Sequence, residues 1–414
     1  MAGSSPTAGA LASERGAALK TSEQASKVRR PRFVVVLNIP SPYRLHFLRE
    51  LNRRLEGRGF DLHAHFQAKM HPDFDNWRLG SEDLGFPCTF WRDVLPRNRQ
   101  NWHLNPGLLM HLVLSYSDIL LVGGPWMTPT SALATVTGRR GFAIGWVEGN
   151  TLTPGRVSGL YGALKAKMLE KCDVIAAPGR EGRGYVSLLE PLCGSRINVV
   201  DLPNVIDESL FRPATDRLAA GRLLRERLGL GGGDRMAIWP ARLEPVKGIV
   251  EFLEGLSAED LRGWRLVIIG KGSLKPVIEG TIRERGLSSH VRVLDPVAYE
   301  AMPAYYAAAD LFILASMKDL WPLSVVEALH SGLPLLLSCR LGNASEALEG
   351  GGNGWSFDPA DKRKTREAAR SAFDSDRESL QQMGLRSAEL AARRWRSAAV
   401  VDGFLDEVFR IRKG

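Results

Sequence analysis

The chain of 414 residues is 44% hydrophobic and 24% charged. Because a domain takes about 150 residues, this length gives two or three domains that can each bury a core, which excludes a single small binding module and a wholly disordered chain. The net charge is +9, and residues 27–58 hold nine basic residues and two acids. Such a stretch favours an anionic partner, namely a membrane surface, a nucleic acid or a phosphorylated substrate.

Residues 1–31 are predicted to be a disordered tail, because they are rich in Ala, Ser and Gly and lack the apolar core of a signal peptide. The most apolar run, residues 108–122, is interrupted by His111, Ser115 and Asp118, so no segment is expected to span a bilayer. The four cysteines form no CxxC pair, which predicts neither a disulfide framework nor a zinc cluster. A cytoplasmic protein is therefore expected.

From residue 32 onward, short apolar runs alternate with helical patterns, which is typical of parallel sheets covered by helices. We assign residues 32–205 to an N-terminal Rossmann-like domain with strands at 33–37, 61–66, 119–122, 143–147, 174–176 and 197–200. A helix is predicted over residues 42–57, with a leucine stripe that packs on the sheet. Its arginines are expected to form either a solvated face or a surface for anionic lipid.

Residues 206–385 are assigned to a second Rossmann-like domain, with strands at 236–239, 266–269, 291–294, 311–314 and 335–337. Residues 386–414 are expected to form a C-terminal helix that returns to the first domain. The predicted fold class is α/β, with two doubly wound domains that face one another across a cleft. Ligands of such sheets bind beyond the carboxyl ends of the strands, so the cleft is the expected site.

The loops that follow the second set of strands carry residues suited to a nucleotide diphosphate. Arg242 and Lys247 follow the first of these strands, and together they could neutralise a diphosphate, although the pair taken alone is more typical of a solvated loop. Gly270 and Gly272 follow the next strand, where small residues let a backbone approach a ligand or simply form a tight turn.

The stretch 316–329 is the most informative. Pro322 fits the first turn of a helix, whose unpaired N–H groups form an anion site. Asp319 precedes this helix, and Glu327 lies about one and a half turns inside it. We expect one carboxylate to face the sugar of a donor and the other its ribose. The alternative for Glu327 is a cap or a pairing inside a packed helix, and it is disfavoured because the surrounding sequence is apolar and a bare carboxylate there needs a partner.

These motifs, in this order, resemble the family 4 retaining glycosyltransferases of GT-B fold. The resemblance rests on Arg242-x4-Lys247, Gly270-x-Gly272, residues 291–316, Asp319-x7-Glu327 and the segments 203–213 and 342–354, and it is dense from about residue 173 to residue 358. It implies that a set of residues binds the donor: Arg242, Lys247 and the N–H groups of Leu323 and Ser324 at the diphosphate, Asp319 at the sugar, Glu327 at the ribose, and Gly270, Gly272 and Val297 near the base.

Three features depart from that family. Asp319 stands where the family usually has Glu, Glu148 stands where it often has His, and residues 38–44 replace a Gly-rich loop. Glu148 is the first-domain candidate to face the acceptor or the donor sugar, and a surface carboxylate at a strand end is the equally weighted alternative. Asp73 and Asp75 form a DxD pattern, but the resemblance implies a metal-independent reaction with no cofactor besides the nucleotide-sugar donor.

The resemblance implies front-face transfer by a hexosyltransferase-type enzyme to a glycan or lipid-linked acceptor, as in polysaccharide biosynthesis. The basic helix over residues 42–57 adds the hypothesis of contact with the inner, anionic face of the membrane. Nucleic-acid binding is disfavoured, since no aromatic stacking motif or reader fold accompanies the basic charge. Two other functions remain open: a sugar-nucleotide isomerase or epimerase of GT-B fold, and a non-catalytic protein that binds sugar nucleotides or glycans.

Overall fold

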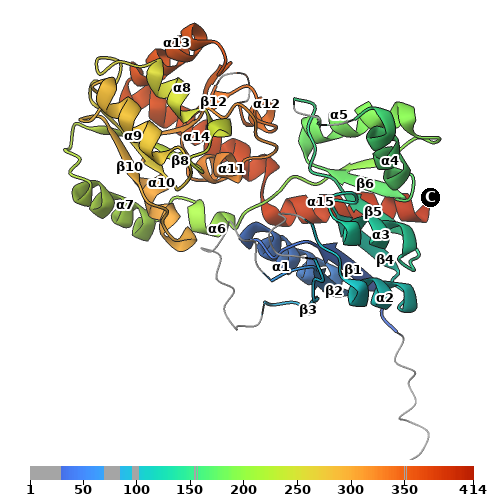
Figure 1. Cartoon of the computed structure of the whole chain (residues 1–414). Helices are drawn as coiled ribbons and strands as arrows, with labels where there is room; N and C mark the ends of the chain where they lie inside the picture. The colour runs from blue at the N-terminus through green and yellow to red at the C-terminus, as the bar shows by residue number, and fades with distance from the viewer. Residues whose placement is uncertain are drawn as a thin grey trace, which may run out of the picture.

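The computed structural model describes residues 29–69, 84–95, 102–152, 155, 157–348, 350 and 352–414. Figure 1 shows two bodies, each built on a parallel sheet with helices on both faces. The predicted α/β architecture with two doubly wound domains is confirmed. None of the helices in these ranges is long and apolar enough to cross a membrane. The predicted tail falls almost wholly outside the described residues.

The N-terminal sheet has seven strands in the order β3-β2-β1-β4-β5-β6-β7. Every neighbouring pair is parallel, and Phe33 of the central strand pairs with Leu62 on one side and Ile119 on the other. Near-continuous apolar sequence makes these strands suited to burial on both faces. The strands are β1 (Arg32–Leu37), β2 (Asp61–Phe66), β3 (Cys88–Phe90), β4 (Ile119–Gly123), β5 (Ala143–Trp146), β6 (Val174–Ala177) and β7 (Val199–Asp201).

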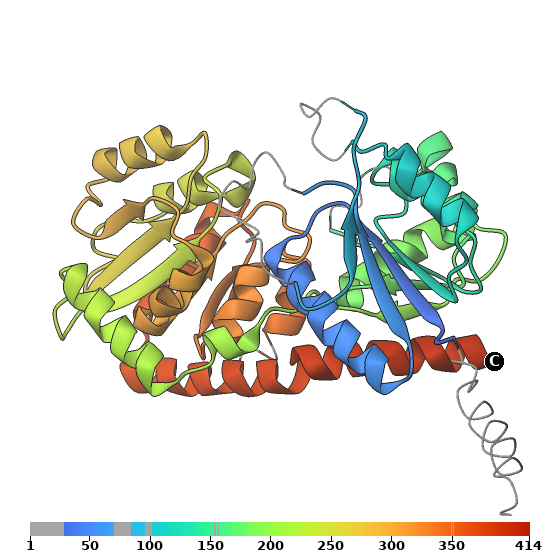
Figure 2. The same ribbon diagram turned by 90° about the horizontal axis from the view of Figure 1, so that it is seen from below.

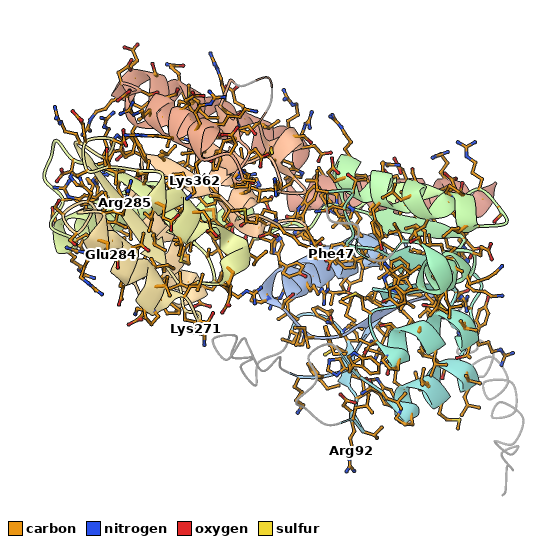
Figure 3. All side chains as sticks on the ribbon, turned by 45° about the horizontal axis from the view of Figure 1, so that its top comes forward. Phe47, Arg92, Lys271, Glu284, Arg285 and Lys362 are labelled. Atoms are coloured by element: carbon orange, nitrogen blue, oxygen red, sulfur yellow. The ribbon has the colours of Figure 1, made fainter. Side chains whose placement is uncertain are left out.

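Two helical layers cover this sheet. Val35 and Leu37 of β1 face the layer of α1 (Pro42–Gly57) and α15 (Ser397–Lys413), whereas Val34 and Val36 face the opposite layer, as the two-residue period of a strand requires. Phe47 on α1 packs against Trp146 with ring centroids 5.0 Å apart (Figure 3). The opposite layer contains α2 (Pro106–Leu114), α3 (Pro129–Thr137), α4 (Gly159–Leu169) and α5 (Gly179–Leu189).

The C-terminal sheet has six parallel strands in the order β10-β9-β8-β11-β12-β13 and a single large core. Its strands are β8 (Arg235–Pro240), β9 (Trp264–Ile269), β10 (Val291–Leu294), β11 (Leu311–Leu314), β12 (Leu335–Ser338) and β13 (Gly354–Phe357). Its helices are α6 (Glu208–Phe211), α7 (Thr215–Arg227), α8 (Ile249–Glu254), α9 (Lys275–Glu284), α10 (Met302–Ala308), α11 (Leu323–His330), α12 (Ala344–Ala347), α13 (Lys362–Phe373) and α14 (Arg377–Arg394). Three short 3-10 helices, η1 (Glu190–Leu192), η2 (Pro245–Lys247) and η3 (Tyr299–Ala301), complete the described elements.

The end of the chain forms two helices. Figure 2 shows α14 beside the C-terminal domain and α15 running on beneath the N-terminal domain. Val401, Phe404 and Leu405 of α15 belong to the core that also contains α1. At the surface of this contact, the Arg58 guanidinium lies 3.2 Å from Asp402 and 2.9 Å from Asp406. The last helix is therefore a structural part of the first domain.

Three details of the sequence prediction need correction. The strands β3 and β13 were not predicted, because their sequences, CTF and GWSF, lack the run of aliphatic residues that marks the other strands. The helix expected to begin at Pro322 begins at Leu323, and Pro322 is its extended N-cap residue with ψ of 116°. The helix expected over residues 386–414 is divided at residues 395–396, since α14 ends at Arg394.

Candidate active site

Four loops gather at the carboxyl edge of the C-terminal sheet, and backbone hydrogen bonds join them. Leu243 N–H, after β8, donates to Lys271 O, after β9, at 2.9 Å. Met317 N–H, after β11, donates to Val246 O at 2.8 Å, and the loop after β12 joins through its own bond to the Asp319 carbonyl. The residues predicted from four separate motifs are thereby brought to one edge.

Lys247 and Asp319 form a close ion pair at this edge. Lys247 Nζ lies 2.5 Å from Asp319 Oδ2, and the two side chains are only 14% and 18% exposed. A charge-assisted bond in a partly desolvated place is stronger than one in open solvent. Arg242 lies on the same loop as Lys247, exposed at the end of β8. The arrangement therefore presents two cations, one of them paired to a carboxylate.

Gly270 and Gly272 have a packing role that the sequence did not indicate. A Cβ added to Gly270 would lie 1.9 Å from Ala241 O, and one added to Gly272 would lie 2.3 Å from Leu243 O. The backbone that these glycines approach is thus the loop that carries Arg242, and no ligand is needed to explain them. Val297 lies in the loop after β10, partly buried against the same core.

Helix α11 begins at this edge with an open N-terminus. No side chain caps it, and Val325 N–H makes the first backbone bond, to Pro322 O at 3.2 Å. Within the described ranges, the N–H groups of Leu323 and Ser324 have no hydrogen-bond acceptor. Asn343 anchors the turn, because its side-chain amide donates to Pro322 O at 3.1 Å. Such a terminus attracts anions through its unpaired donors and the helix dipole.

Glu327 is held inside the domain. The hydroxyl of the fully buried Tyr306 donates to Glu327 Oε2 at 2.6 Å. Burial raises the pKa of Glu327 to about 7, and the hydrogen bond from Tyr306 opposes this shift. The internal pairing considered for Glu327 is therefore present, with Tyr306 as its partner. One oxygen of the carboxylate is thereby fixed, and the group can titrate near neutral pH.

On the N-terminal side, Glu148 follows β5 and is held by two neighbours. Arg44 Nη2 lies 3.4 Å from Glu148 Oε2, and the Asn204 amide donates to Glu148 Oε1 at 3.1 Å. Arg44 also donates to Asn38 Oδ1. The adjacent Tyr43 is so desolvated that its pKa rises to about 12. Glu148 is thus a positioned carboxylate, and Arg44 and Asn204 are partners that the sequence did not reveal.

Hydrogen bonds that involve backbone atoms join the loops at the carboxyl edges of the two sheets. The buried Asn150, two residues after Glu148, donates its amide to Asp319 O at 3.1 Å and to Leu320 O at 3.5 Å. Arg180 N–H, at the start of α5, donates to Glu346 Oε1 at 2.6 Å. The loop that carries Glu148 is therefore tied directly to the loop that carries Asp319.

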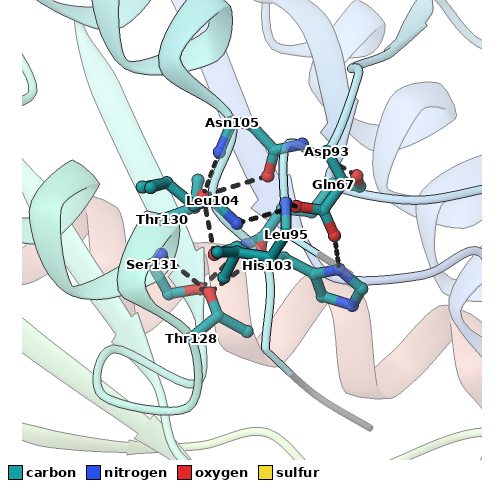
Figure 4. Close-up of polar contacts among 9 residues, drawn as sticks. All are labelled: Gln67, Asp93, Leu95, His103, Leu104, Asn105, Thr128, Thr130 and Ser131. Carbon is teal, nitrogen blue, oxygen red and sulfur yellow. Dashed lines mark hydrogen bonds and ion pairs between the residues drawn. The ribbon is translucent and has the colours of Figure 1, made fainter. Parts of the chain in front are cut away.

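A buried network of polar side chains fixes other loops of the N-terminal domain (Figure 4). None of it was predicted from the sequence. Gln67, after β2, accepts from Thr128 Oγ1 at 2.8 Å and donates to Ser131 Oγ at 2.9 Å. A second part joins His103 Nδ1 to Asp93 Oδ2 at 2.6 Å. The network contains Gln67, Asp93, His103, Asn105, Thr128, Thr130 and Ser131. No motif marks these polar residues, because folding alone brings them together.

The predicted DxD pattern at Asp73 and Asp75 lies outside the described residues. Among the residues that are described, no group of three or more His, Cys, Asp or Glu side chains could hold a metal ion. The charges at the junction are instead those of Lys247, Asp319, Arg242 and Glu148.

Two facing doubly wound domains with their ligand-binding edges in contact define the GT-B class of fold. Residues 222–389 match the family model described as "Glycosyl transferases group 1", so the resemblance predicted from the sequence is confirmed over this part of the chain.

Two curated relatives each match about half of the chain. A D-inositol 3-phosphate glycosyltransferase from Nocardia farcinica is 32% identical over 55% of this chain and 50% of its own length. An alpha-monoglucosyldiacylglycerol synthase from Acholeplasma laidlawii is 32% identical over 49% of this chain and 50% of its own length. The chain thus spans about half the length of the curated relatives it matches.

Solved structures extend the likeness of fold to most of the chain. Anabaena Alr3699/HepE in complex with UDP and glucose aligns with a TM-score of 0.69 at 14% identity, over 92% of this chain and all of that one. Sucrose-phosphate synthase from Thermosynechococcus elongatus aligns with a TM-score of 0.70 at 14% identity, over 92% of this chain and 98% of that one. The GT-B fold predicted from the sequence is confirmed.

Proposed function

We propose that this protein is a retaining, hexosyltransferase-type glycosyltransferase. It moves a sugar from a nucleotide-diphosphate sugar to a hydroxyl group of a glycan or lipid-linked acceptor. The observation that carries the proposal is the gathering of Arg242, the Lys247–Asp319 pair and the open N-terminus of α11 at one sheet edge. The names of the relatives support it, since both curated relatives are sugar-transferring enzymes by name and solved neighbours hold UDP or UDP-glucose.

The diphosphate binds to the two cations and to the N–H groups of Leu323 and Ser324. Arg242 grips it through several N–H donors, and Lys247 supplies a compact charge. When a phosphate replaces Asp319 beside Lys247, the released carboxylate becomes an acceptor for sugar hydroxyls. Glu327 takes the ribose, while Gly270, Gly272 and Val297 border the base. Each of these roles follows from the family resemblance and is compatible with the geometry described above.

Transfer proceeds on one face of the sugar. The bond from the anomeric carbon to the diphosphate oxygen breaks as the acceptor oxygen forms its bond on the same side, and the acceptor proton passes to a phosphate oxygen. No covalent sugar–enzyme intermediate is formed, so catalysis rests on stabilising the leaving diphosphate and on positioning. Glu148, held by Arg44 and Asn204, orients the acceptor or the donor sugar at this junction. The reaction needs no metal ion or further cofactor.

The acceptor side of the proposal includes contact with the inner face of an anionic membrane. Helix α1 was the expected contact surface, but its arginines are largely engaged within the protein. Arg54 lies 3.2 Å from Asp402, Arg58 pairs with Asp402 and Asp406, and Arg53 pairs with Glu50. Asp402 and Asp406 belong to α15 and Glu50 to α1 itself, so much of the basic charge near α1 is balanced within the protein and we place the membrane contact elsewhere.

The experiment that tests the function measures donor turnover over a panel of UDP-, GDP- and ADP-sugars, with and without glycan or lipid-linked acceptors. Release of nucleotide that is slow without acceptor and faster with it supports transfer. An isomerised donor would instead establish an isomerase, and tight donor binding with no turnover of any kind would establish a binding protein. Either of these results would overturn the proposal.

A further inference from the structure

The outer surface of the helical layer that covers the N-terminal sheet is apolar. Leu160 on α4 is 90% exposed and Leu114 on α2 is 70% exposed. They belong to a surface that we call the α2–α4 face, formed by Met110, Val113, Leu114, Leu133, Val136, Leu160, Tyr161 and Leu164. The three helices pack side by side on the same face of the sheet, so these residues lie on one layer of the molecule (Figure 1). Apolar surface of this extent is uncommon unless it contacts something.

Formal charge is absent from α2 and α3 themselves. Residues 106–138 contain a single formally charged residue, Asp118, and its carboxylate accepts a hydrogen bond from Arg32 N–H at 2.8 Å. On α4, Lys165 turns inward, where its ammonium donates to Tyr185 Oη at 2.7 Å. By contrast, α13 of the C-terminal domain carries six charged residues in twelve. The apolar character is therefore specific to the α2–α4 face and not a property of all surface helices.

Basic residues lie at one end of this face. On α4, Lys167 follows Leu160 and Leu164 at helical spacing, so apolar and basic side chains share one stripe, and Lys167 lies 2.8 Å from Glu170 at the end of this stripe. Lys171 lies just beyond the end of the helix. Arg139 and Arg140 follow α3, and Arg140 Nη2 donates to Lys171 O at 2.9 Å, which places the two groups together. Apolar side chains with lysine and arginine at their border suit the boundary between acyl chains and anionic headgroups.

We propose that the α2–α4 face, with its basic border, docks on an anionic phospholipid bilayer. This inference rests on the proposed function only for the presence of a lipid-linked acceptor. The same domain carries Glu148, which follows β5 at the carboxyl edge of the sheet, whereas the basic border precedes β5 and β6 at the amino edge. A second copy of the chain is a poorer partner, because the α2–α4 face offers hardly any acidic residues to meet the basic border.

The test is vesicle flotation of the full chain, with phosphatidylcholine vesicles and with vesicles that also contain about 30 mol% phosphatidylglycerol. We expect binding to the anionic vesicles and little to the neutral ones. The double variant Leu114→Glu/Leu160→Glu should bind about tenfold or more weakly, because two exposed leucines lose their apolar contact. The matched control is Leu223→Glu/Leu385→Glu, which alters exposed leucines of the C-terminal domain and should bind like the wild type.

Three results would overturn the inference: no binding by the wild type, unchanged binding by the Leu114→Glu/Leu160→Glu variant, or equal loss in the control. Light scattering of the same samples provides a further check. A dimer that the first variant dissociates, without any vesicle binding, would assign the face to self-association. Donor turnover without vesicles is measured in parallel, and a failure of flotation with intact turnover would leave the proposed function standing.

Discussion

The two halves of the site are built in different ways. The C-terminal half is made by backbone, since its loops bond to one another through N–H and carbonyl groups and pack so closely that Gly270 and Gly272 cannot accept a side chain. The N-terminal half is made by side chains, in which Arg44 and Asn204 hold Glu148. A backbone-built site needs small residues and fixed spacings, whereas a side-chain-built site can be assembled from other residue pairs. The family match, over residues 222–389, falls in the backbone-built half.

Removal of Lys247 is expected to have the largest effect. Because the proposed catalysis stabilises the leaving diphosphate, Lys247→Ala should lower kcat/KM by about 10²-fold or more, and Arg242→Ala by a similar factor. Steady-state release of nucleotide measures this, with the folded state checked by circular dichroism. The control is Arg262→Ala, an exposed cation 82% accessible at the opposite edge of the sheet. Wild-type rates in both site variants would show that the C-terminal half does not bind the diphosphate.

Addition of one methyl group at Gly270 should destabilise the C-terminal half. A Cβ there would overlap Ala241 O, so we expect Gly270→Ala to lower the free energy of unfolding by about 1–3 kcal/mol, as overpacking does. Urea or thermal unfolding measures the change. Gly280→Ala is the matched control, because nothing lies within 4 Å of the position and a helical Gly-to-Ala change should stabilise slightly. An unchanged free energy of unfolding in Gly270→Ala would show that close backbone contacts do not build the C-terminal half of the site.

The pH dependence of nucleotide binding, which we assign to Glu327, is expected to be a more moderate effect. Its pKa is raised to about 7, so the carboxylate is mostly protonated below that pH. If ribose hydroxyls donate to the carboxylate, nucleotide binding should tighten as pH rises, by about tenfold between roughly pH 6 and pH 8. Calorimetric titration of the nucleotide at several pH values tests this. Glu327→Gln keeps the acceptor for Tyr306 and should bind with little pH dependence, and a wild-type affinity that is flat with pH would exclude this role.

The smallest expected effect concerns the link between the halves. Asn150→Ala removes the amide that donates to Asp319 O and Leu320 O, at a cost of about 1 kcal/mol for a buried hydrogen bond. We expect kcat to fall about fivefold with the KM for donor nearly unchanged, because the C-terminal half binds the donor alone. Asn198→Ala, which removes an exposed amide of the same domain, is the control. An equal loss in both variants would assign Asn150 a merely structural role.

The sequence predicted the fold well because its buried strands are apolar and its turns are marked by Gly and Pro. The edge strands β3 and β13 were missed, since CTF and GWSF contain no run of aliphatic residues. The position of Asp319 close to Lys247 agrees with the expected convergence of their loops, but the direct ion pair between them could not be read from spacing. Asn150 and the Gln67 network escaped for another reason: their partners are backbone atoms or distant polar side chains, which leave no local pattern.

Helix α15 has a consequence for the order in which the chain can fold. It occupies the last part of the sequence, yet its Val401, Phe404 and Leu405 complete the core of the first domain. During synthesis, the α1 side of the N-terminal sheet is therefore only partly covered until α15 has left the ribosome. The second domain, whose core is contiguous in the chain up to Trp395, can close earlier. Loss of α15 would consequently destabilise the domain that is made first and spare the one that is made after it.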